Sequence, residues 1–397
     1  MVDTATPTTI PTTAHAPATP TRRLRIALAH DWLCGLRGGE HVLERLAELV
    51  TREHEPAGLY VMFDDGLPLT ATVDAMPHTV SRVGRWPGAT RLRRWLLPMY
   101  PRAVAELSDM LEREHRRRAI DLVISTSSAA VKGLRPPRGV PHLCYCHSPA
   151  RYVWSRSDEY AGGLRGLGLL VWGERFRRWD ARSAANVTRF VANSEYTARL
   201  ISQSYRRGAT VVYPPLRDEF LASPVEQGVG DERPWLVVSA LEPYKRVDLA
   251  ILAANQANRP LVIVGHGSQR EALEKLAGPT VRFVGRASED ELMAWYRRAR
   301  LVLFPQVEDF GLVAVEAQAC GVPVVARRDG GALETVVEGK TGAFFGEPSP
   351  QALLRAAEAC PDACAEACRA NAERFSGAAF DAAMRREIAE TMSAGAA

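Results

Sequence analysis

Two glutamates eight residues apart, Glu308 and Glu316, have a spacing that suits chemistry. Glu308 follows a short apolar run at 301–305, and the segment after it, DFGLVAVEAQACG, has the composition of a helix. Free N–H groups at a helix N-terminus bind oxygen ligands, and two carboxylates at this spacing can reach the two ends of one ligand. The same residues could instead cap a helix and face solvent, so the spacing alone leaves two interpretations open.

A pair of cations, Lys245 and Arg246, follows another apolar run at 235–241. Lysine offers a point charge and arginine a bidentate fork, and both are suited to phosphate. The chain contains no Asp-x-Asp, the pattern expected where a metal bridges a diphosphate. We therefore expect these two cations, and no metal ion, to bind an anion; a solvated loop pair is the alternative.

Two glycines and a histidine are further candidates. Gly38 and Gly39 lie before an apolar helical pattern and permit close approach of a ligand to the backbone. Their interval lacks the G-x-G-x-x-G spacing of a dinucleotide site, which argues against an NAD-dependent oxidoreductase. His147 follows an apolar run at 142–146, so we expect it to point from a strand end into a cleft; a hydrogen-bonded structural histidine is the alternative. His30 has a similar position, with a weaker case.

These residues need a scaffold of strands and helices, and the apolar pattern predicts two. Short runs rich in Val, Ile and Leu alternate with helical patterns, which indicates parallel sheets buried on both faces. The runs lie near residues 24–33, 121–128, 142–148, 189–194 and 210–215, and again at 235–240, 261–265, 281–285, 301–305 and 322–326. The fold class predicted is α/β, with two Rossmann-like doubly wound domains whose strand ends face one interdomain cleft.

The length of 397 residues is also typical of two domains. We expect a disordered tail at 1–21, rich in Thr, Pro and Ala, and a first domain at 22–220. A Gly- and Pro-rich linker at 221–234 leads to a second domain at 235–375, and a helix and tail follow at 376–397.

The motifs occur in an order that resembles retaining glycosyltransferases of family 4, which have the GT-B fold. The segments that carry the resemblance are SALEPYKRVDLAI at 239–251, LVIVGHGSQREAL at 261–273, the E-x7-E of Glu308 and Glu316, and GGALETVVEGKTGAFF at 330–345. Four further segments, at 30–32, 38–40, 146–154 and 191–201, resemble the mannosyltransferase branch that builds bacterial surface polysaccharides.

The resemblance implies that the first domain, 22–220, lies on the acceptor side and that the second, 235–375, binds the nucleotide sugar. It also implies roles for the candidate residues. It implies that Glu308 and His147 contact the donor sugar and that Glu316 contacts the ribose hydroxyls. Lys245 would stabilise the diphosphate with Arg246. The chain departs from many family members at Ala240, where they carry an arginine. Substrate contacts are also expected from the residues that begin the helix after Glu308, namely Asp309, Phe310, Gly311 and Leu312.

The function implied is transfer of a sugar, with retention, from a nucleotide-sugar donor to a hydroxyl of a glycan or lipid-linked acceptor. Mannose from GDP-mannose is expected, with UDP-glucose or UDP-N-acetylglucosamine as the alternative donor. A non-catalytic nucleotide-sugar-binding protein is the alternative of another class. No cofactor is expected.

Composition limits the partners. A net charge of +4 and the predicted fold do not favour nucleic acid. We expect a cytoplasmic enzyme at the inner face of the plasma membrane, since no apolar run has the length of a spanning helix. Five arginines and two tryptophans at 82–100 suit an anionic membrane surface, or a solvated basic face over buried aromatic rings.

The seven cysteines are expected to be reduced. Cys360, Cys364 and Cys368 recur at intervals of four, which predicts one helix face with the outer pair too far apart for a single metal ion. We expect them to be small packing residues.

Overall fold

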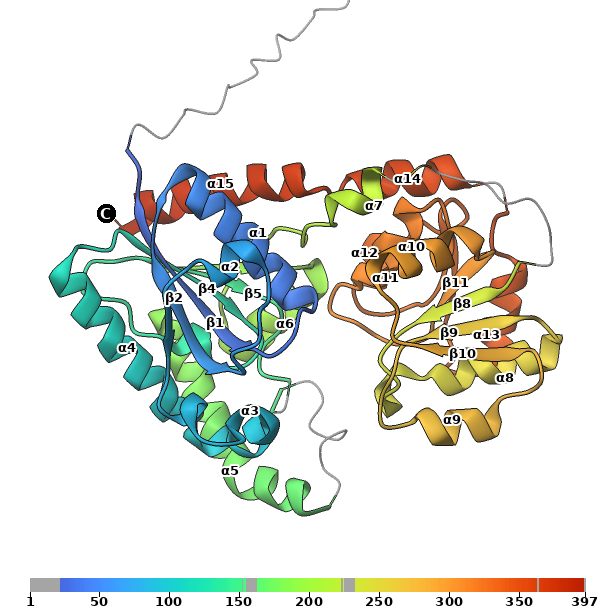
Figure 1. The fold of residues 1–397 in the computed structure, drawn as a ribbon, viewed down its shortest axis with the longest axis horizontal. Helices are drawn as coiled ribbons and strands as arrows, with labels where there is room; N and C mark the ends of the chain where they lie inside the picture. The colour runs from blue at the N-terminus through green and yellow to red at the C-terminus, as the bar shows by residue number, and fades with distance from the viewer. Residues whose placement is uncertain are drawn as a thin grey trace, which may run out of the picture.

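The strands predicted from the apolar runs form two parallel sheets. The computed structural model describes residues 22–151, 153–154, 163–222, 224, 233–362 and 364–395, without the side chains of 94 and 163–171. The expected tail at 1–21 and most of the expected linker at 221–234 lie outside the described residues. The predicted GT-B architecture is confirmed: Figure 1 shows two α/β domains, each with helices on both faces of its sheet.

The first sheet has seven strands in the order β3-β2-β1-β4-β5-β6-β7. These are β1 (Arg25–Leu33), β2 (Glu55–Asp64), β3 (His78–Val80), β4 (Leu122–Ser127), β5 (His142–Cys146), β6 (Arg189–Ala192) and β7 (Thr210–Val211). Its helices are α1 (Gly38–Glu53), α2 (Ala71–Asp74), α3 (Ala89–Leu92), α4 (Tyr100–Arg117), α5 (Gly163–Ser183) and α6 (Glu195–Tyr205), with 3₁₀ turns η1 (Val83–Arg85), η2 (Arg93–Trp95), η3 (Leu97–Met99), η4 (Val131–Gly133) and η6 (Ala184–Asn186).

The second sheet has six strands in the order β10-β9-β8-β11-β12-β13. These are β8 (Trp235–Val238), β9 (Leu261–Val264), β10 (Val281–Gly285), β11 (Leu301–Phe304), β12 (Val324–Arg327) and β13 (Gly342–Phe345). Its helical elements are α7 (Asp218–Ala222), η7 (Pro243–Lys245), α8 (Val247–Ala257), α9 (Arg270–Leu276), α10 (Glu289–Arg298), α11 (Leu312–Ala319), α12 (Ala332–Thr335), α13 (Pro350–Glu358) and α14 (Ala365–Glu373), and α15 (Gly377–Gly395) ends the described chain.

Alternation along the strands divides the core of each domain between the two faces of its sheet. In β1, Ala27 and Ala29 join a cluster with α4, while Ile26 and Leu28 join a cluster with α1. Both faces are buried, so the strand reads as a continuous apolar run.

The chain passes between the domains twice, at neighbouring points. Leu216 and Phe220 lie in the sequence range expected for the first domain, yet both pack in the core of the second. The later crossing follows Phe375, whose carbonyl accepts a hydrogen bond from the Leu216 N–H at 2.7 Å. A Cβ on Gly377 would lie 2.8 Å from the Arg45 guanidinium, so the return crossing passes tightly over α1.

Helix α15 lies along the first domain although it follows the second in sequence (Figure 1). Its apolar face places Phe380, Met384 and Ile388 in the same cluster as α1. The amphipathic pattern predicts a helix here, but it does not tell which sheet the helix covers.

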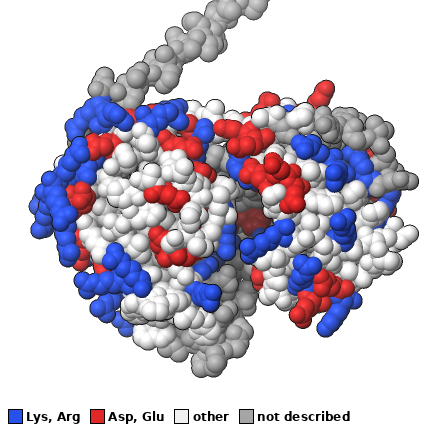
Figure 2. Space-filling view, in the orientation of Figure 1, with Lys and Arg blue, Asp and Glu red and all other residues white. Residues whose placement is uncertain are grey.

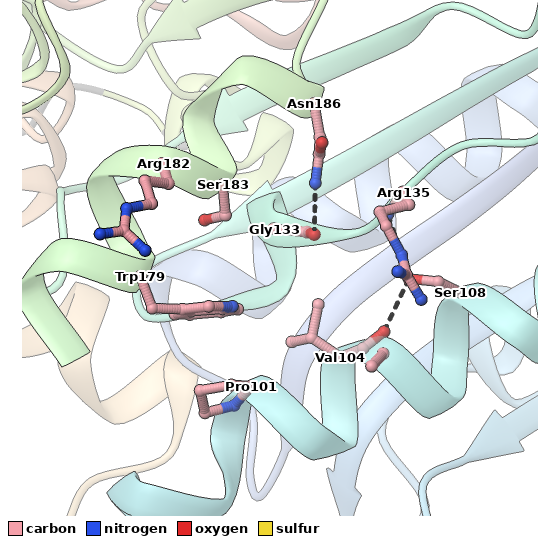
Figure 3. Close-up of a pocket in the computed structure, with 10 residues that line it drawn as sticks. Pro101, Val104, Ser108, Gly133, Arg135, Trp179, Arg182, Ser183 and Asn186 are labelled. Atoms are coloured by element: carbon pink, nitrogen blue, oxygen red, sulfur yellow. Dashed lines mark hydrogen bonds between the residues drawn. The ribbon is translucent and has the colours of Figure 1, made fainter. Parts of the chain in front are cut away.

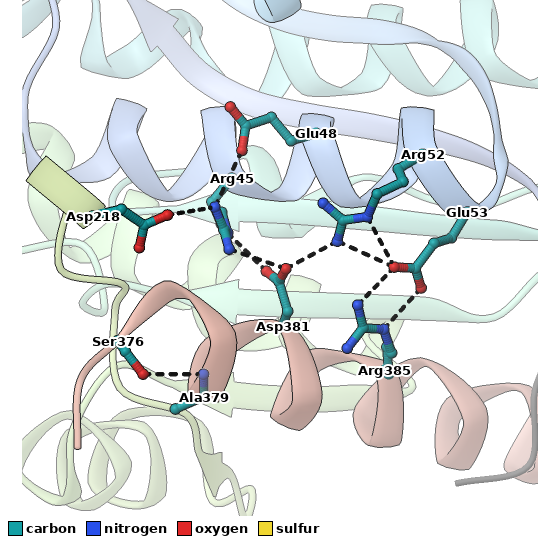
Figure 4. A network of polar contacts seen from close by, with 9 residues as sticks. All are labelled: Arg45, Glu48, Arg52, Glu53, Asp218, Ser376, Ala379, Asp381 and Arg385. Atoms are coloured by element: carbon teal, nitrogen blue, oxygen red, sulfur yellow. Dashed lines mark hydrogen bonds and ion pairs between the residues drawn. The ribbon is translucent and has the colours of Figure 1, made fainter. Parts of the chain in front are cut away.

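A network of charged residues fixes α15 to α1 (Figure 4). The buried carboxylate of Asp381 accepts from Arg45 at 2.9 Å and from Arg52 at 2.9 Å. Glu53 accepts from Arg385 at 2.7 Å, and its bonds with Arg385 and Arg52 lower the pKa of Glu53 to about 2. The network therefore holds α1, which begins at Gly38, against α15.

The three cysteines expected on one helix face do not share a helix. α13 ends at Glu358, Cys360 and Pro361 follow it, and Cys364 lies at the N-cap of α14, which contains Cys368. Pro361 disfavours continuation of a helix, so no single helix carries the three cysteines. The sulfur atoms of Cys364 and Cys368 are 3.6 Å apart.

We expect Asp381→Ala to lower the free energy of unfolding by about 1–3 kcal/mol, because it leaves two arginines without their buried acceptor. Urea unfolding measures the change. The matched control is Glu112→Ala, which removes an exposed pair with Arg116 within α4 and costs about 0.3–0.5 kcal/mol. Equal losses in both variants would contradict the role of the network.

Candidate active site

The carboxyl ends of the two sheets face each other, and the predicted site residues follow those ends. Figure 2 shows a hollow between the domains with Lys and Arg side chains on both walls. The second domain contributes the loop after β8 and the loop after β11, and the first domain contributes the loops after β1 and β5. The site is therefore assembled from four loops that are far apart in sequence.

Lys245 and Glu308 form an ion pair on the wall of the second domain. The Nζ atom of Lys245 in η7 donates to Oε1 of Glu308, four residues beyond the end of β11. Each side chain is about 15% exposed, so the two charges compensate each other in a largely desolvated place. A ligand that binds Lys245 must therefore compete with Glu308 or move it.

The loop from Glu308 to α11 is held by two glycines. The Gly331 N–H donates to the Glu308 carbonyl at 2.9 Å. A Cβ on Gly330 would lie 2.4 Å from that same oxygen, and one on Gly331 would lie 2.4 Å from the Phe310 Cα. Only residues without a Cβ allow this approach, so the glycines of the GGALE segment fix the backbone that carries Glu308.

Helix α11 begins in the cleft without a side-chain cap. Its N-cap is Gly311, with a φ of 93°, and no side chain hydrogen-bonds to the first turn. Phe310 is buried against the rings of Tyr213 and Phe375. Uncapped N–H groups and the helix dipole favour a negatively charged ligand at this end of the helix.

The first domain brings Gly38, Gly39 and His147 to the opposite wall. A Cβ on Gly39 would lie 3.6 Å from Nε2 of His147, and one on Gly38 would lie 3.1 Å from Cδ1 of Leu312. The first turns of α1 and α11 therefore meet across the cleft, with the histidine beside them.

His147 is neutral in this environment. Burial, together with the nearby charges of His30 and Arg151, lowers the pKa of its imidazole to about 3. Its Nε2 atom is buried and has no hydrogen-bond partner among the described residues. The ring thus offers an unused polar atom at the point where the two domains meet.

Glu316 lies further along α11, and both its oxygens are engaged. Oε2 accepts from the Tyr296 hydroxyl at 3.0 Å and Oε1 accepts from Arg217 at 3.3 Å. A carboxylate has lone pairs for about four such bonds, so Glu316 keeps acceptor capacity for a ligand. Arg246 instead pairs with Asp248 in the first turn of its own helix, at 3.0 Å.

Three contacts between the domains involve residues that sequence reasoning did not single out. Arg151 forms an ion pair with Asp309, and Ser194 Oγ donates to the Asp309 carbonyl at 2.6 Å. Glu334 of the second domain accepts from the N–H groups of Glu195 and Tyr196, which begin α6 of the first. Arg151, Ser194 and Glu334 all lie inside the motif segments named above. Their partners could not be predicted, because the pairing depends on how the two domains meet.

Models of two glycosyltransferase families match the two halves of the chain. The model described as Glycosyltransferase Family 4 matches residues 37–220, and the model described as Glycosyl transferases group 1 matches residues 223–363. The chain belongs to glycosyltransferase family 4. The family resemblance carried by the motifs is therefore confirmed.

Curated relatives of this family 4 member are similar over part of its length. A GDP-mannose-dependent alpha-(1-6)-phosphatidylinositol monomannoside mannosyltransferase from Mycolicibacterium smegmatis is 34% identical over 40% of this chain and 48% of its own. A D-inositol 3-phosphate glycosyltransferase from Jonesia denitrificans is 36% identical over 35% of this chain and 37% of its own. The chain thus spans about half or less of the length of these relatives.

Solved structures share the fold over nearly the whole chain. Sucrose-phosphate synthase from Thermosynechococcus elongatus has a TM-score of 0.72 at 18% identity and covers 94% of this chain and all of its own. Anabaena HepE in complex with UDP has a TM-score of 0.65 at 18% identity and covers 93% and 100%. At these identities the likeness concerns the fold alone.

A separate pocket of about 230 Å³ lies in the first domain of this family 4 member (Figure 3). It lies between α4, η4 and the end of α5, with Arg135, Arg182 and Trp179 among its lining residues. None of the predicted site residues lines it. Among the described residues, no group of three His, Cys, Asp or Glu side chains could hold a metal ion.

We expect the His147 ring to stay neutral in the folded protein down to about pH 4, since its pKa is lowered from 6.5 to about 3. The unfolded chain takes up this proton below pH 6.5 and the folded chain does not, so His147 makes folding less favourable as the pH falls from 6.5 to 3. NMR of labelled histidine, with His147→Gln to assign the signal, measures the titration. A ring that titrates near pH 6.5 in the folded protein would refute this.

Proposed function

We propose that the protein transfers a sugar from a nucleotide-sugar donor to an acceptor hydroxyl, with retention of configuration. The observation that carries this is the Lys245–Glu308 pair beside the uncapped N-terminus of α11. A cation, a carboxylate and free backbone donors at one point suit a ligand with a charged diphosphate next to a sugar. Membership of glycosyltransferase family 4 supports the same reaction.

In this proposal the protein supplies the charge that the leaving group requires. Breaking the bond between sugar and diphosphate develops negative charge, which Lys245 and the first turn of α11 stabilise. Arg246, the other cation that the sequence led us to expect there, contributes only if it leaves its pair with Asp248. The loop residues Asp309, Phe310, Gly311 and Leu312 shape that turn. The proposal routes no step through a metal ion.

The carboxylates and the histidine orient the donor. Glu308 accepts from a sugar hydroxyl once Lys245 turns to the diphosphate, and Glu316 accepts from the ribose diol. The Nε2 atom of His147 binds the transferred sugar from the other wall, where Gly38 and Gly39 leave room. The acceptor hydroxyl attacks on the face that the diphosphate leaves, and the leaving oxygen takes its proton.

The donor proposed is GDP-mannose, with a glycan or lipid-linked acceptor. Support comes from the mycobacterial relative that is named as GDP-mannose-dependent and acts on a phosphatidylinositol mannoside. The sequence leaves UDP-glucose or UDP-N-acetylglucosamine as an alternative, and a non-catalytic nucleotide-sugar-binding protein as a further one.

Release of free GDP or UDP from a panel of nucleotide sugars tests the function and the donor together. We expect turnover with GDP-mannose, and a fall of about ten- to a hundredfold in Lys245→Ala, because a charge-assisted bond to the leaving group is lost. Arg116→Gln on α4 is the control for loss of a cation. Binding of nucleotide sugars without turnover would favour the non-catalytic alternative, and unchanged turnover in Lys245→Ala would overturn the role of the lysine.

We also propose that the arginine- and tryptophan-rich segment at 82–100 contacts an anionic membrane surface at the inner face of the plasma membrane. Trp86, Leu92 and Trp95 are each about half exposed there, at 48%, 52% and 47%. Arg85 and Arg91 are exposed beside them. No helix among the described residues is long and apolar enough to cross a bilayer.

The structure selects which arginines to test. Arg93 is turned inward, with its guanidinium 5.8 Å from the centre of the Trp32 ring. Arg85→Gln with Arg91→Gln should therefore reduce sedimentation with anionic vesicles, since each surface arginine contributes about 1 kcal/mol to such binding. The control is the double variant Arg116→Gln with Arg117→Gln, which removes two positive charges from α4, outside the segment. Equal vesicle binding in both double variants would assign the segment to the solvent-exposed alternative.

A further inference from the structure

Arg151 is a cation of the first domain that reaches the site loop of the second. Its Nη2 atom donates to Oδ2 of Asp309, the residue directly after Glu308. The Asp309 side chain is buried, and its backbone is held by Ser194. Two adjacent carboxylates, Glu308 and Asp309, thus each hold one cation, and the two cations come from opposite domains.

The backbone around Arg151 is anchored behind the cleft. Arg177 of α5 donates from Nε to the Val153 carbonyl at 2.8 Å, and the Trp154 indole donates to Asp180 at 2.7 Å. Asp180 is buried and also pairs with the buried Lys132 at 2.9 Å. The described residues 153 and 154, which lie close to Arg151 in sequence, are thus fixed to α5.

A diphosphate favours a second cation beside Lys245, and of the described residues neither position 240 nor position 246 presents one there. Ala240 has no charged side chain, and the guanidinium of Arg246 is bonded to Asp248. With Lys245 and Arg151 paired to Glu308 and Asp309, the four side chains are balanced. A bound diphosphate adds at least two negative charges to this group, so it favours both cations turning toward it.

We propose that Arg151 is the second diphosphate-binding cation of this site, exchanging Asp309 for the diphosphate when a nucleotide ligand binds. The inference rests on the proposed function, because it requires a nucleoside diphosphate at Lys245. A bidentate guanidinium suits two phosphate oxygens better than a second lysine does. Since Arg151 belongs to the first domain, the diphosphate then joins the two domains directly.

Calorimetry with nucleotides that differ by one phosphate isolates this contact. The probes are GDP and GMP, with UDP and UMP in a second series. We expect Arg151→Gln to weaken GDP binding by about ten- to a hundredfold and GMP binding by less than about threefold, because only the diphosphate engages the guanidinium. Arg151→Lys, which keeps the charge without the fork, should lie between. Glu316→Ala should weaken GDP and GMP alike, since both carry the ribose.

Two variants separate a ligand contact from a mere contact between domains. Asp309→Asn removes the competitor of the diphosphate and should tighten GDP binding, whereas a purely structural pair predicts the same loss in Asp309→Asn as in Arg151→Gln. Arg116→Gln is the matched arginine control on α4. Thermal unfolding without ligand shows whether Arg151→Gln is folded, and if it is not, Arg151→Lys and Asp309→Asn decide.

Three results overturn the inference. Unchanged GDP affinity in Arg151→Gln would exclude the contact, and so would parallel losses of GDP and GMP or equal losses in Arg151→Gln and Asp309→Asn. These results leave the proposed function intact as long as the unaltered protein binds GDP or UDP. Absence of any nucleoside diphosphate binding by the folded, unaltered protein would overturn both.

Discussion

The backbone of Glu308 and Asp309 is the point on which the arrangement of the site depends. The carbonyl of Glu308 accepts from Gly331 of the second domain, and the carbonyl of Asp309 accepts from Ser194 of the first. The adjacent side chains pair with Lys245 and Arg151, again one from each domain. Two consecutive residues therefore fix the loop of the candidate site and join the two domains.

Charge balance explains why these groups can gather in a poorly solvated place. A buried charge is costly unless a partner compensates it, and here each cation has a carboxylate. Glu334 compensates the positive end of α6 in the same way, because its carboxylate accepts from the first two N–H groups of that helix. The cleft is thus lined by pairs of opposite charge.

The sequence predicts features that depend on local pattern, and it misses those that depend on how distant segments meet. Most strands were predicted because their apolar runs are continuous, whereas β13 begins with glycine, and in β2 a glutamate, a proline, an alanine and a glycine precede the apolar residues. Positions at strand ends, such as His147 and Glu308, follow from the rule that parallel sheets present their carboxyl ends to a ligand. Arg151 and Glu334 could not be assigned, because their partners lie more than 130 residues away in the other domain.

The return of α15 to the first domain has a consequence for the order in which the chain folds. Phe380, Met384 and Ile388 complete the core around α1, so the chain up to Ile388 must leave the ribosome before that core is filled. The sheet of the second domain and the helices that cover it come from one continuous stretch between Leu216 and Phe375. During synthesis the first domain therefore exposes apolar surface until α15 is made. The second domain, although it is translated later, can complete its own core without α15.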